Sequence, residues 1–489
     1  MVATLMEPPA GDTLDRLAEV ADVLEVRADA AGDLDPAALR ERFPGKLLYT
    51  LRSRAEGGRS DSAPSVRHPR IRAAAGAGWD LVDLEATRDL ESEILGDVAP
   101  ARRLISWHGR ADRLERLRER ADELLEVEAR LYKLVVRPRA HGQELLPLSL
   151  LGSLRRTDVL AFAAGALGTW TRLLAPRLGA PWVFGAAGST PGAPGQPTIE
   201  LLREDYGLPA LPPVRAVFGI AGNPVDQSLS PRLHNRAYRE AGVEALYLPF
   251  HVERFADFWL EIVEGGGLAD VGFPVRGLSV TSPWKRIALA VAGATSPLAT
   301  RVGAANSLAL HDGVWEAECT DGEGVVRSLE ERHVPLKGTR AAVLGAGGAG
   351  RAAACALAAA GSEVTLVNRD RERLERARDE LGVTIVDWEE FSPAGFRVLV
   401  NATPLGRRGD DPLPFEPAAC DPGCTVVDLT YLRNATTRLT RESRAAGLRA
   451  VDGREVLLYQ AVPQFEFMTG SGLPVELARS WLALPRDGA

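Results

Sequence analysis

Cysteine is scarce in this sequence of 489 residues, and that scarcity excludes a fold built on disulfide bonds. The four cysteines are scattered over the second half of the chain. Two of them lie close together, but no matching pair of cysteines or histidines completes a metal site. We therefore expect a reduced, cytoplasmic protein without a bound metal. The four are Cys319, Cys355, Cys420 and Cys424.

Long apolar runs are also missing. No stretch of 18 or more uncharged apolar residues occurs, which argues against a transmembrane helix. The first residues, "MVATLMEPPAGDTLDRL", contain no basic region followed by an apolar core, so we expect no signal peptide. A net charge of −8 argues against a general binder of nucleic acids or membrane surfaces.

Lysine is nearly absent: lysine and arginine together number 58, and only four are lysine. Where only a positive charge is needed, this chain uses arginine. A remaining lysine can mark a task that arginine cannot perform, such as losing a proton to become a nucleophilic amine. Lys133 stands out because it lies inside the apolar run "RLYKLVVR" (130–137), where a buried ammonium is costly. Lys46 and Lys337 precede strands in turns, where any solvated charge would serve.

Short apolar runs alternate with helical patterns along the chain, which is typical of α/β architecture. Helical segments such as 110–128 and 168–179 separate these runs. Eight βα repeats in a compact span predict a (β/α)₈ barrel, with a doubly wound sheet as the alternative. The eight runs cover residues 2–6, 22–28, 46–52, 80–86, 103–109, 131–137, 158–164 and 181–187.

The second half of the chain contains two further α/β patterns. The Pro-rich "GLPALPPVRA" (207–216) is typical of a linker, new α/β patterns begin at 216 and 339, and helical periodicity returns at 453–470. We therefore predict five parts. They are a barrel (1–206), a linker (207–214), a substrate-binding α/β domain (215–330), a Rossmann dinucleotide-binding domain (331–455) and C-terminal helices that pack back on the substrate domain (456–489).

Polar residues gather where the strands of the predicted barrel end, and the chemistry of such barrels takes place there. A lysine among apolar groups and arginines has a lowered pKa, and its free amine can attack a ketone. A histidine can shuttle the proton. Each residue also has a structural explanation: an ion pair, a satisfied rim histidine, or a lysine that snorkels to the barrel mouth. The residues are Glu25, Arg27, Arg52, Glu56, His108, Lys133, Arg172 and Gln196.

Five segments of the first half resemble type I 3-dehydroquinate dehydratase: "LEVRAD", "YTLRSRAEGG", "LISWHG", "LYKLVV" and "APGQ", within residues 1–205. The resemblance implies that Lys133 forms a Schiff base with the ketone of 3-dehydroquinate. It also implies that His108 moves the proton and that Glu56 orients the imidazole. The implied substrate-binding residues are Glu25, Arg27, Arg52, Arg172 and Gln196.

The motif G-x-G-x-x-G at 345–350 follows the strand "RAAVL" and opens an Ala-rich helix, which is the context of a dinucleotide-binding loop. At the end of the next strand the chain carries Asn368 and Arg369, followed by Arg373, instead of an acid. Because a guanidinium suits a 2′-phosphate, NADP is favoured over NAD. The predicted cofactor-binding residues are Gly345, Gly347, Gly348, Gly350, Asn368, Arg369, Arg373 and Thr403.

Six further segments resemble shikimate dehydrogenase over residues 214–485: "GNPVDQSLSPRLHN", "GLSVTSPWK", "GAANSL", "TDGEG", "NATPLG" and "LLYQAVPQFE". Reduction of a ketone needs a hydride and a proton for the new alkoxide, and Lys285 paired with Asp321 can give that proton. The resemblance implies that the substrate is bound by Ser228, Ser230, Thr281, Asn306, Tyr431 and Gln460.

Together, the two resemblances imply a bifunctional lyase and oxidoreductase of the shikimate pathway. The first half would dehydrate 3-dehydroquinate to 3-dehydroshikimate, and the second would reduce that product to shikimate with NADPH. Two alternatives remain, a quinate/shikimate dehydrogenase that prefers NAD and a non-catalytic sensor of pathway intermediates. We expect small-molecule partners only, with no nucleic acid or membrane, and the oligomeric state stays open.

Overall fold

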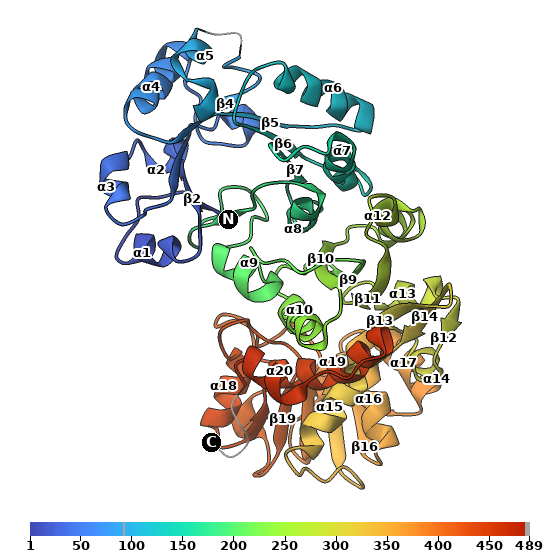
Figure 1. Ribbon diagram of the computed structural model, residues 1–489. Helices are drawn as coiled ribbons and strands as arrows, with labels where there is room; N and C mark the ends of the chain where they lie inside the picture. Colours follow the sequence, from blue (N-terminus) through green and yellow to red (C-terminus); the bar gives the residue numbers. More distant parts are fainter. Residues whose placement is uncertain (91–92, 485–489) are drawn as a thin grey trace. The chain divides into compact units, whose positions relative to one another are not determined.

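The computed structural model describes residues 1–90 and 93–484 (Figure 1). The chain divides into two compact units, each considered below by itself. The first unit comprises Met1–Ala216 and Glu244–Val275, and the second comprises Val217–Val243 and Arg276–Ala489. The predicted division into five parts stays a prediction, and the last residues of its final part, 485–489, lie outside the described residues.

The first unit is built on an eight-stranded parallel sheet in the order β7-β6-β5-β4-β3-β2-β1-β8. Strand β1 pairs with both β2 and β8, so the first and last strands of the repeat are neighbours. This curled sheet confirms the predicted (β/α)₈ barrel class, and each strand lies within one of the eight predicted runs. The strands are β1 (Val2–Leu5), β2 (Val23–Arg27), β3 (Lys46–Thr50), β4 (Leu81–Glu85), β5 (Arg103–Gly109), β6 (Leu131–Val136), β7 (Val159–Ala163) and β8 (Phe184–Ala186).

Helices connect the barrel strands, and α6 and α7 pack beside β6 (Figure 1). The helix expected over 110–128 is α6, whereas the segment expected over 168–179 is split into α8 and η4. Pro176 explains the split, because proline lacks an N–H donor and clashes with the carbonyl four residues earlier. The helices are α1 (Thr13–Ala18), α2 (Ala28–Ala31), α3 (Pro36–Arg40), α4 (Pro64–Gly76), α5 (Ile94–Asp97), α6 (Leu114–Leu125), α7 (Leu146–Leu154), α8 (Thr171–Leu174) and α9 (Ile199–Tyr206), with short turns η1 (Arg54–Glu56), η2 (Pro100–Arg102), η3 (Gln143–Leu145) and η4 (Ala175–Leu178).

A segment distant in sequence completes the first unit. Residues Glu244–Val275 belong to the same compact unit as the barrel. This segment is rich in buried aromatic side chains, including Phe250, Phe255 and Phe258. It contains β10 (Ala245–His251), α11 (Phe255–Phe258), η5 (Trp259–Glu264) and α12 (Gly267–Asp270).

The second unit begins with a mixed sheet whose strands follow the order β9-β11-β13-β14-β12. The hairpin β13–β14 is antiparallel and β11 pairs antiparallel with β13, so β11, β13 and β14 form a continuous ladder. The elements are β9 (Ala216–Gly222), α10 (Ser230–Ala241), β11 (Val275–Val280), α13 (Lys285–Val291), β12 (Ala294–Thr295), α14 (Pro297–Val302), β13 (Ser307–His311), β14 (Val314–Glu318) and α15 (Asp321–Glu330).

A second sheet of this unit is fully parallel, in the order β17-β16-β15-β18-β19-β20. Strand order reverses between β15 and β18, and open α/β sheets bind ligands at such a switch point. Helix α19 packs against α15 and β13, which brings C-terminal residues back to the first sheet of the unit. The elements are β15 (Arg340–Leu344), α16 (Gly348–Ala359), β16 (Glu363–Asn368), α17 (Arg371–Leu381), β17 (Thr384–Asp387), η6 (Trp388–Glu390), β18 (Val398–Asn401), η7 (Pro417–Ala419), β19 (Thr425–Asp428), α18 (Arg438–Ala445), β20 (Arg449–Val451), α19 (Gly453–Thr469) and α20 (Val475–Trp481).

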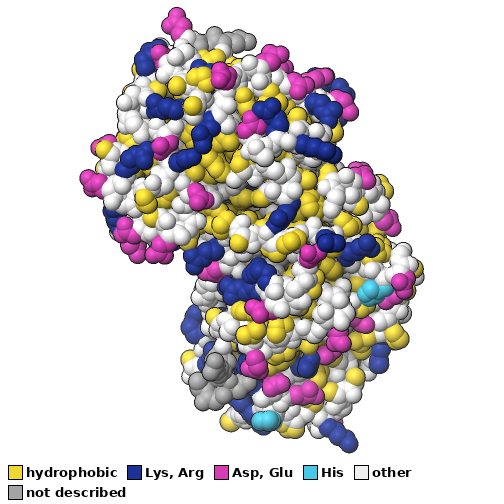
Figure 2. Space-filling model, in the orientation of Figure 1, with side chains coloured by type: hydrophobic (Ala, Val, Ile, Leu, Met, Phe, Trp, Pro, Cys, Tyr) yellow, Lys and Arg dark blue, Asp and Glu magenta, His cyan; other side chains and the backbone are white. Residues whose placement is uncertain are grey.

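The surface mixes charges of both signs. On the face drawn in Figure 2, Lys and Arg side chains are interspersed with Asp and Glu side chains. Within residues 1–90 and 93–484, no helix is both long and apolar enough to cross a membrane. The same described residues contain no cluster of three or more His, Cys, Asp or Glu side chains that could hold a metal ion.

Candidate active sites

The barrel contains a cavity of about 360 Å³ at the carboxyl ends of its strands. All the catalytic and substrate-binding residues that the sequence predicted for the first half line this cavity. They come from six strands or from the loops that follow those strands. The residues predicted to gather at the strand ends of the barrel therefore lie around one cavity. The predicted residues around the cavity are Glu25, Arg27, Arg52, Glu56, His108, Lys133, Arg172 and Gln196.

Lys133 lies on β6 and points its amine into this cavity. Its Nζ lies 3.7 Å from the ring centre of Phe184 and 3.9 Å from Oε1 of Glu25, and its side chain is only 6% exposed. Burial lowers the pKa of Lys133 to about 8, although the Glu25 carboxylate opposes the shift. At pH 7 about a tenth of this amine is therefore unprotonated, far more than for a lysine with the ordinary pKa.

His108 and Glu56 form a hydrogen-bonded pair beside the lysine. Nδ1 of His108 lies 2.9 Å from Oε2 of Glu56. Burial lowers the pKa of His108 well below its usual value, and neighbouring arginines and Lys133 lower it further. The imidazole is therefore neutral and can accept a proton through Nε2 while Nδ1–H donates to Glu56. Burial also raises the pKa of Glu56 to about 7, against the effect of Arg52.

Arg52 is the centre of a buried cluster of acids that the sequence prediction missed in part. Its Nη2 donates to Asp83 at 2.7 Å, and its Nη1 donates to Glu85 and Glu56 at 3.2 Å. Asp83 and Glu85 alternate on β4, so their side chains share the inner face of the barrel. The same alternation of polar residues that pointed to Glu25 and Arg27 in β2 was available in "LVDLE". Arg52 thus holds Glu56 in place as well as bordering the cavity.

Arg172 is a buried cation with few partners. Its Nη1 donates to the Phe184 carbonyl at 3.2 Å, and the guanidinium lies 4.9 Å from the ring centre of Phe162. Among the described residues, its Nε and Nη2 have no hydrogen-bond partner. Burial lowers the pKa of Arg172 to about 10. Because a buried guanidinium without an anion is costly, this cavity is suited to an anionic ligand such as a carboxylate.

Arg27 and Gln196 instead secure the loop above the cavity. Arg27 makes two 2.8 Å hydrogen bonds to the carboxylate of Asp29 and donates to the Gly192 carbonyl at 2.8 Å. Gln196 accepts from the Gly192 amide at 2.7 Å and donates to Thr4 Oγ1 at 3.1 Å. Because these hydrogen bonds join both residues to other parts of the protein, their predicted substrate contacts stay predictions.

A second candidate site lies in the second unit, around Lys285 at the start of α13. Its Nζ donates to Oδ2 of Asp321 at 2.5 Å, and both side chains are about 15% exposed. They border a cavity of about 210 Å³. The predicted residues that line it are Ser230, Thr281, Lys285, Asn306, Asp321, Tyr431 and Gln460. Ser228 borders an adjoining cavity of about 710 Å³ that shares Thr281 and Tyr431 with it.

Asn306 links the polar groups of this cavity. Its Nδ2 lies within 3.0 Å of Asp321 Oδ1, Thr320 Oγ1 and Gln460 Oε1. The sequence prediction missed Gln464, which lies one helical turn after Gln460 on α19. Gln464 accepts from Ser279 Oγ at 2.8 Å and donates to Ser307 Oγ at 2.8 Å. Together, these hydrogen bonds of Asn306 and Gln464 hold the amide of Asn306 and the carboxylate of Asp321 in place.

The glycine loop between β15 and α16 leaves room for a ligand. Gly345 has φ +113°, a conformation that favours glycine, and a Cβ at Gly350 would lie 1.8 Å from the Gly345 carbonyl oxygen. A Cβ at Gly347 would meet nothing within 4 Å, so the loop is open above this residue. The loop borders a cavity of about 440 Å³ through Gly347 and Gly348. This geometry fits a phosphate at a helix N-terminus.

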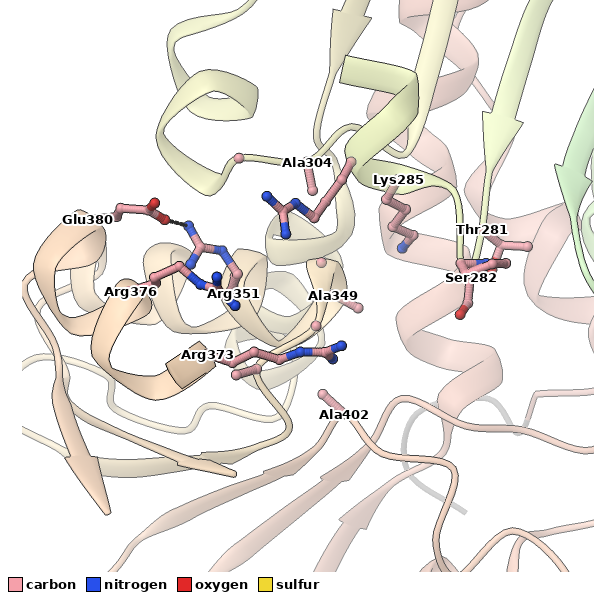
Figure 3. Close-up of a pocket in the computed structure, with 16 residues that line it drawn as sticks. Thr281, Ser282, Lys285, Ala304, Ala349, Arg351, Arg373, Arg376, Glu380 and Ala402 are labelled. Carbon is pink, nitrogen blue, oxygen red and sulfur yellow. Dashed lines mark hydrogen bonds and ion pairs between the residues drawn. The ribbon is translucent and has the colours of Figure 1, made fainter. Parts of the chain in front are cut away.

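Arginines surround the same cavity (Figure 3). Arg373 extends from α17 toward Ala349 and the open centre, with Lys285 and Thr281 on the opposite side. Asp370 accepts the Arg373 amide at 3.1 Å and forms an ion pair with its Nε at 3.0 Å, so this acid caps α17 and orients the arginine. Three other arginines line the cavity that were not predicted from the sequence: Arg286, Arg351 and Arg376.

Five predicted cofactor residues do not line this cavity. Two of them, Gly345 and Gly350, shape the glycine loop, and the other three are Asn368, Arg369 and Thr403. Thr403 donates to Asn401 Oδ1 at 2.7 Å and shapes the loop after β18, where Ala402 borders the cavity. Thr281, Lys285 and Ala349 border both the 440 Å³ and the 210 Å³ cavities, so the two are contiguous. A dinucleotide in one and a ketone in the other would meet beside Lys285.

Comparisons with known proteins follow the same division of the chain. The family model described as Type I 3-dehydroquinase matches residues 2–210, and the Shikimate dehydrogenase substrate binding domain matches residues 220–308. The model described as Ketopantoate reductase PanE/ApbA matches residues 341–395, which hold the glycine loop, β16 and α17. The matched ranges thus include the barrel, Lys285 of the second site and the glycine loop, whereas Asp321 and Gln460 lie outside them.

Individual relatives agree with these matches. A shikimate dehydrogenase (NADP(+)) of Halobacterium salinarum is 40% identical over 268 residues, which is 54% of this chain and 98% of the relative. A bifunctional chloroplastic 3-dehydroquinate dehydratase/shikimate dehydrogenase of Arabidopsis thaliana is 27% identical over 488 residues, covering 94% of this chain and 79% of the relative. The crystal structure of shikimate dehydrogenase from Aquifex aeolicus is 29% identical with a TM-score of 0.50, covering 55% of this chain and 97% of that one.

Proposed function

This chain belongs to the family of bifunctional type I 3-dehydroquinate dehydratase/shikimate dehydrogenase enzymes, and from that premise we propose how its residues carry out the two reactions. The barrel dehydrates 3-dehydroquinate to 3-dehydroshikimate. The second active site reduces 3-dehydroshikimate to shikimate with NADPH. The product of the first reaction is the substrate of the second.

In the dehydration, the free amine of Lys133 attacks the substrate ketone, water leaves, and an iminium forms. The iminium acidifies the neighbouring C–H, and neutral His108 takes that proton while Glu56 holds the ring. The resulting imidazolium then gives the proton to the departing hydroxyl, and a second water releases the product from Lys133. Arg172 pairs with the substrate carboxylate, which supplies the anion that its buried guanidinium lacks.

In the reduction, Lys285 gives a proton to the oxygen of the ketone as that oxygen becomes an alkoxide. Asp321 keeps Lys285 oriented and compensates its charge, while Asn306 and Gln460 hold Asp321 and the ring hydroxyls. The substrate carboxylate is bound at the other end of the cavity by Ser230 and Tyr431, together with Ser228 of the adjoining cavity. NADPH, when bound, supplies the hydride.

The residues around the glycine loop fit NADP. The open backbone at Gly347 accommodates the pyrophosphate, and Arg373 and Arg376 on α17 supply guanidinium groups suited to a 2′-phosphate. Acids of the same region are already engaged, since Asp370 caps α17 and Glu380 pairs with Arg351. The arginines therefore favour NADP over NAD.

One observation carries this proposal: Lys133 lines a cavity together with His108, and Lys285 lines a cavity in an ion pair with Asp321, while Lys46 and Lys337 are exposed. The unpaired thiols of the four cysteines support a reducing, cytoplasmic location, which stays a prediction.

The test supplies the purified chain with 3-dehydroquinate and NADPH and no other enzyme. We expect shikimate to accumulate with one NADPH consumed per molecule. Borohydride added with 3-dehydroquinate should attach reduced substrate at Lys133, located by peptide mass spectrometry. Lys133→Ala should still reduce added 3-dehydroshikimate, and Lys285→Ala should still dehydrate 3-dehydroquinate. A folded chain that gives neither product would refute the proposal.

A further inference from the structure

Four buried aromatic rings join two loops of the barrel, and we call them the aromatic bridge: His141, Trp170, Phe250 and Phe258. The rings of Trp170 and Phe250 lie 5.2 Å apart at 69°, those of Phe250 and Phe258 5.3 Å apart, and those of Phe258 and His141 5.6 Å apart. Trp170, Phe250 and Phe258 are each only 1% exposed. The first and last of these pairs are edge-to-face, and such pairs add stabilisation beyond the burial of their area.

Both ends of the aromatic bridge lie on loops at the carboxyl ends of barrel strands. Trp170 lies in the loop after β7 and directly precedes α8, which carries Arg172. His141 lies in the loop after β6, the strand that carries Lys133. The two middle rings come from β10 and α11, in the segment Glu244–Val275. That segment lies inside the range 220–308 matched by the shikimate dehydrogenase substrate binding domain.

Arg172 needs such external support. Among the described residues, its buried guanidinium has one hydrogen bond, to the Phe184 carbonyl, and a contact with the Phe162 ring, so few interactions of its own hold it in place. Helix α8 has only four residues, which is too short to be stable by itself. Thr171 anchors one side of the turn by accepting the Ala163 amide at 2.8 Å and donating to the Gly168 carbonyl at 2.7 Å. Trp170 anchors the other side through Phe250.

We propose that Trp170 and Phe250 are positioning residues for the dehydration, so that a segment of reductase sequence holds the substrate-carboxylate arginine of the dehydratase. This inference rests on the proposed dehydratase function. It implies that contact between the two rings sets the affinity of the barrel for 3-dehydroquinate, while Lys133, His108 and Glu56 carry out the chemistry unchanged.

The test measures dehydration kinetics of full-length Trp170→Leu and Phe250→Leu. We expect KM for 3-dehydroquinate to rise roughly tenfold in each, with kcat within about twofold, and Trp170→Phe to restore most of the affinity. The matched control is Trp79→Leu. Trp79 is also buried in a T-shaped pair, with Tyr49 at 5.5 Å, but does not border the barrel cavity. The Trp79→Leu substitution should lower the melting temperature and leave KM for 3-dehydroquinate unchanged.

A double variant identifies the route of the effect. Added to Arg172→Ala, Trp170→Leu should raise KM no further, because the arginine on which it acts is gone. An unchanged KM in Trp170→Leu, or a rise that Trp79→Leu reproduces, would overturn the inference. So would a full additional rise in the Arg172→Ala background. Absence of dehydration and of a Lys133 adduct in the unmodified chain would instead be a failure of the proposed function.

Discussion

The two lysines that line cavities in this chain, Lys133 and Lys285, occupy opposite electrostatic settings. Lys133 lies against the ring of Phe184, and its nearest carboxylate oxygen, on Glu25, is 3.9 Å from Nζ. Lys285 forms a 2.5 Å ion pair with Asp321 and is more exposed. A nucleophile must lose its proton before it acts, and burial without a close anion promotes that loss. A proton donor must keep its proton until the alkoxide forms, and a carboxylate stabilises that ammonium.

These opposite settings explain why arginine could replace neither Lys133 nor Lys285. Arginine keeps its proton at all pH values relevant to proteins, so it can provide charge but neither a free amine nor a proton. The chain accordingly uses arginine at Arg52, Arg172 and Arg373, where fixed charge and hydrogen bonds suffice. Each lysine therefore marks a step in which a proton moves.

The largest effect is expected for Lys133→Arg. Because no nucleophile remains, kcat for dehydration should fall by on the order of 10⁴-fold or more, while reduction of 3-dehydroshikimate is retained. Product formation is followed by the ultraviolet absorbance of the new enone. Lys46→Arg, at an exposed lysine of the same barrel, is the matched control and should leave both rates unchanged. Retained dehydration in Lys133→Arg would remove the contrast between the two lysines.

A smaller effect is expected for Lys285→Arg. The charge and the pairing with Asp321 are kept, but proton delivery is lost, so kcat for reduction should fall by about 10²- to 10⁴-fold. NADPH oxidation measured by its absorbance gives the rate. Lys337→Arg, at an exposed position of the same unit, serves as the control. If Lys285→Arg reduced the ketone at the normal rate, charge alone would suffice at this position.

The smallest effect is expected from pH. The pKa of Lys133 is lowered to about 8, so the ammonium predominates below that pH and the reactive amine above it. The kcat/KM for dehydration should therefore rise about tenfold between pH 7 and pH 9 and then level off. Ionisation of Glu56, whose pKa is raised to about 7, acts in the same direction.

Glu25→Gln sharpens this test, because the Glu25 carboxylate raises the pKa of Lys133. Its removal should move the rise in kcat/KM to lower pH. A shift to higher pH, or a profile that falls between pH 7 and pH 9, would contradict the assignment of Lys133 as the free amine.

Much of the barrel could be predicted from local sequence. Its strands are short apolar runs bounded by turns, and all eight lie where the runs were found. The break between α8 and η4 was missed because the apolar periodicity of 168–179 continues through Pro176. The packing of Glu244–Val275 with the barrel was not predictable, because it depends on contacts between residues far apart in sequence.

The candidate sites were predictable where a residue belongs to a motif. Residues that act through geometry were missed: Asp83 and Glu85 reach Arg52 across neighbouring strands, and Gln464 reaches Ser279 from a distant helix. Arg351 and Arg376 line the dinucleotide cavity from α16 and α17, whereas Arg369, chosen for its position after β16, does not line it. Sequence spacing identifies which strand a residue follows, but side-chain reach decides which cavity it borders.

The burial of Lys133 and the exposure of Lys46 and Lys337 have a practical consequence for labelling. Acylating reagents that modify primary amines should find accessible side chains on the folded chain at Lys46 and Lys337. Lys46 begins β3 of the barrel, and Lys337 lies just before β15 of the dinucleotide-binding sheet. A fluorophore can thus be attached to each half of the natural sequence without engineered cysteines, and Lys133, whose side chain is only 6% exposed, should remain unmodified.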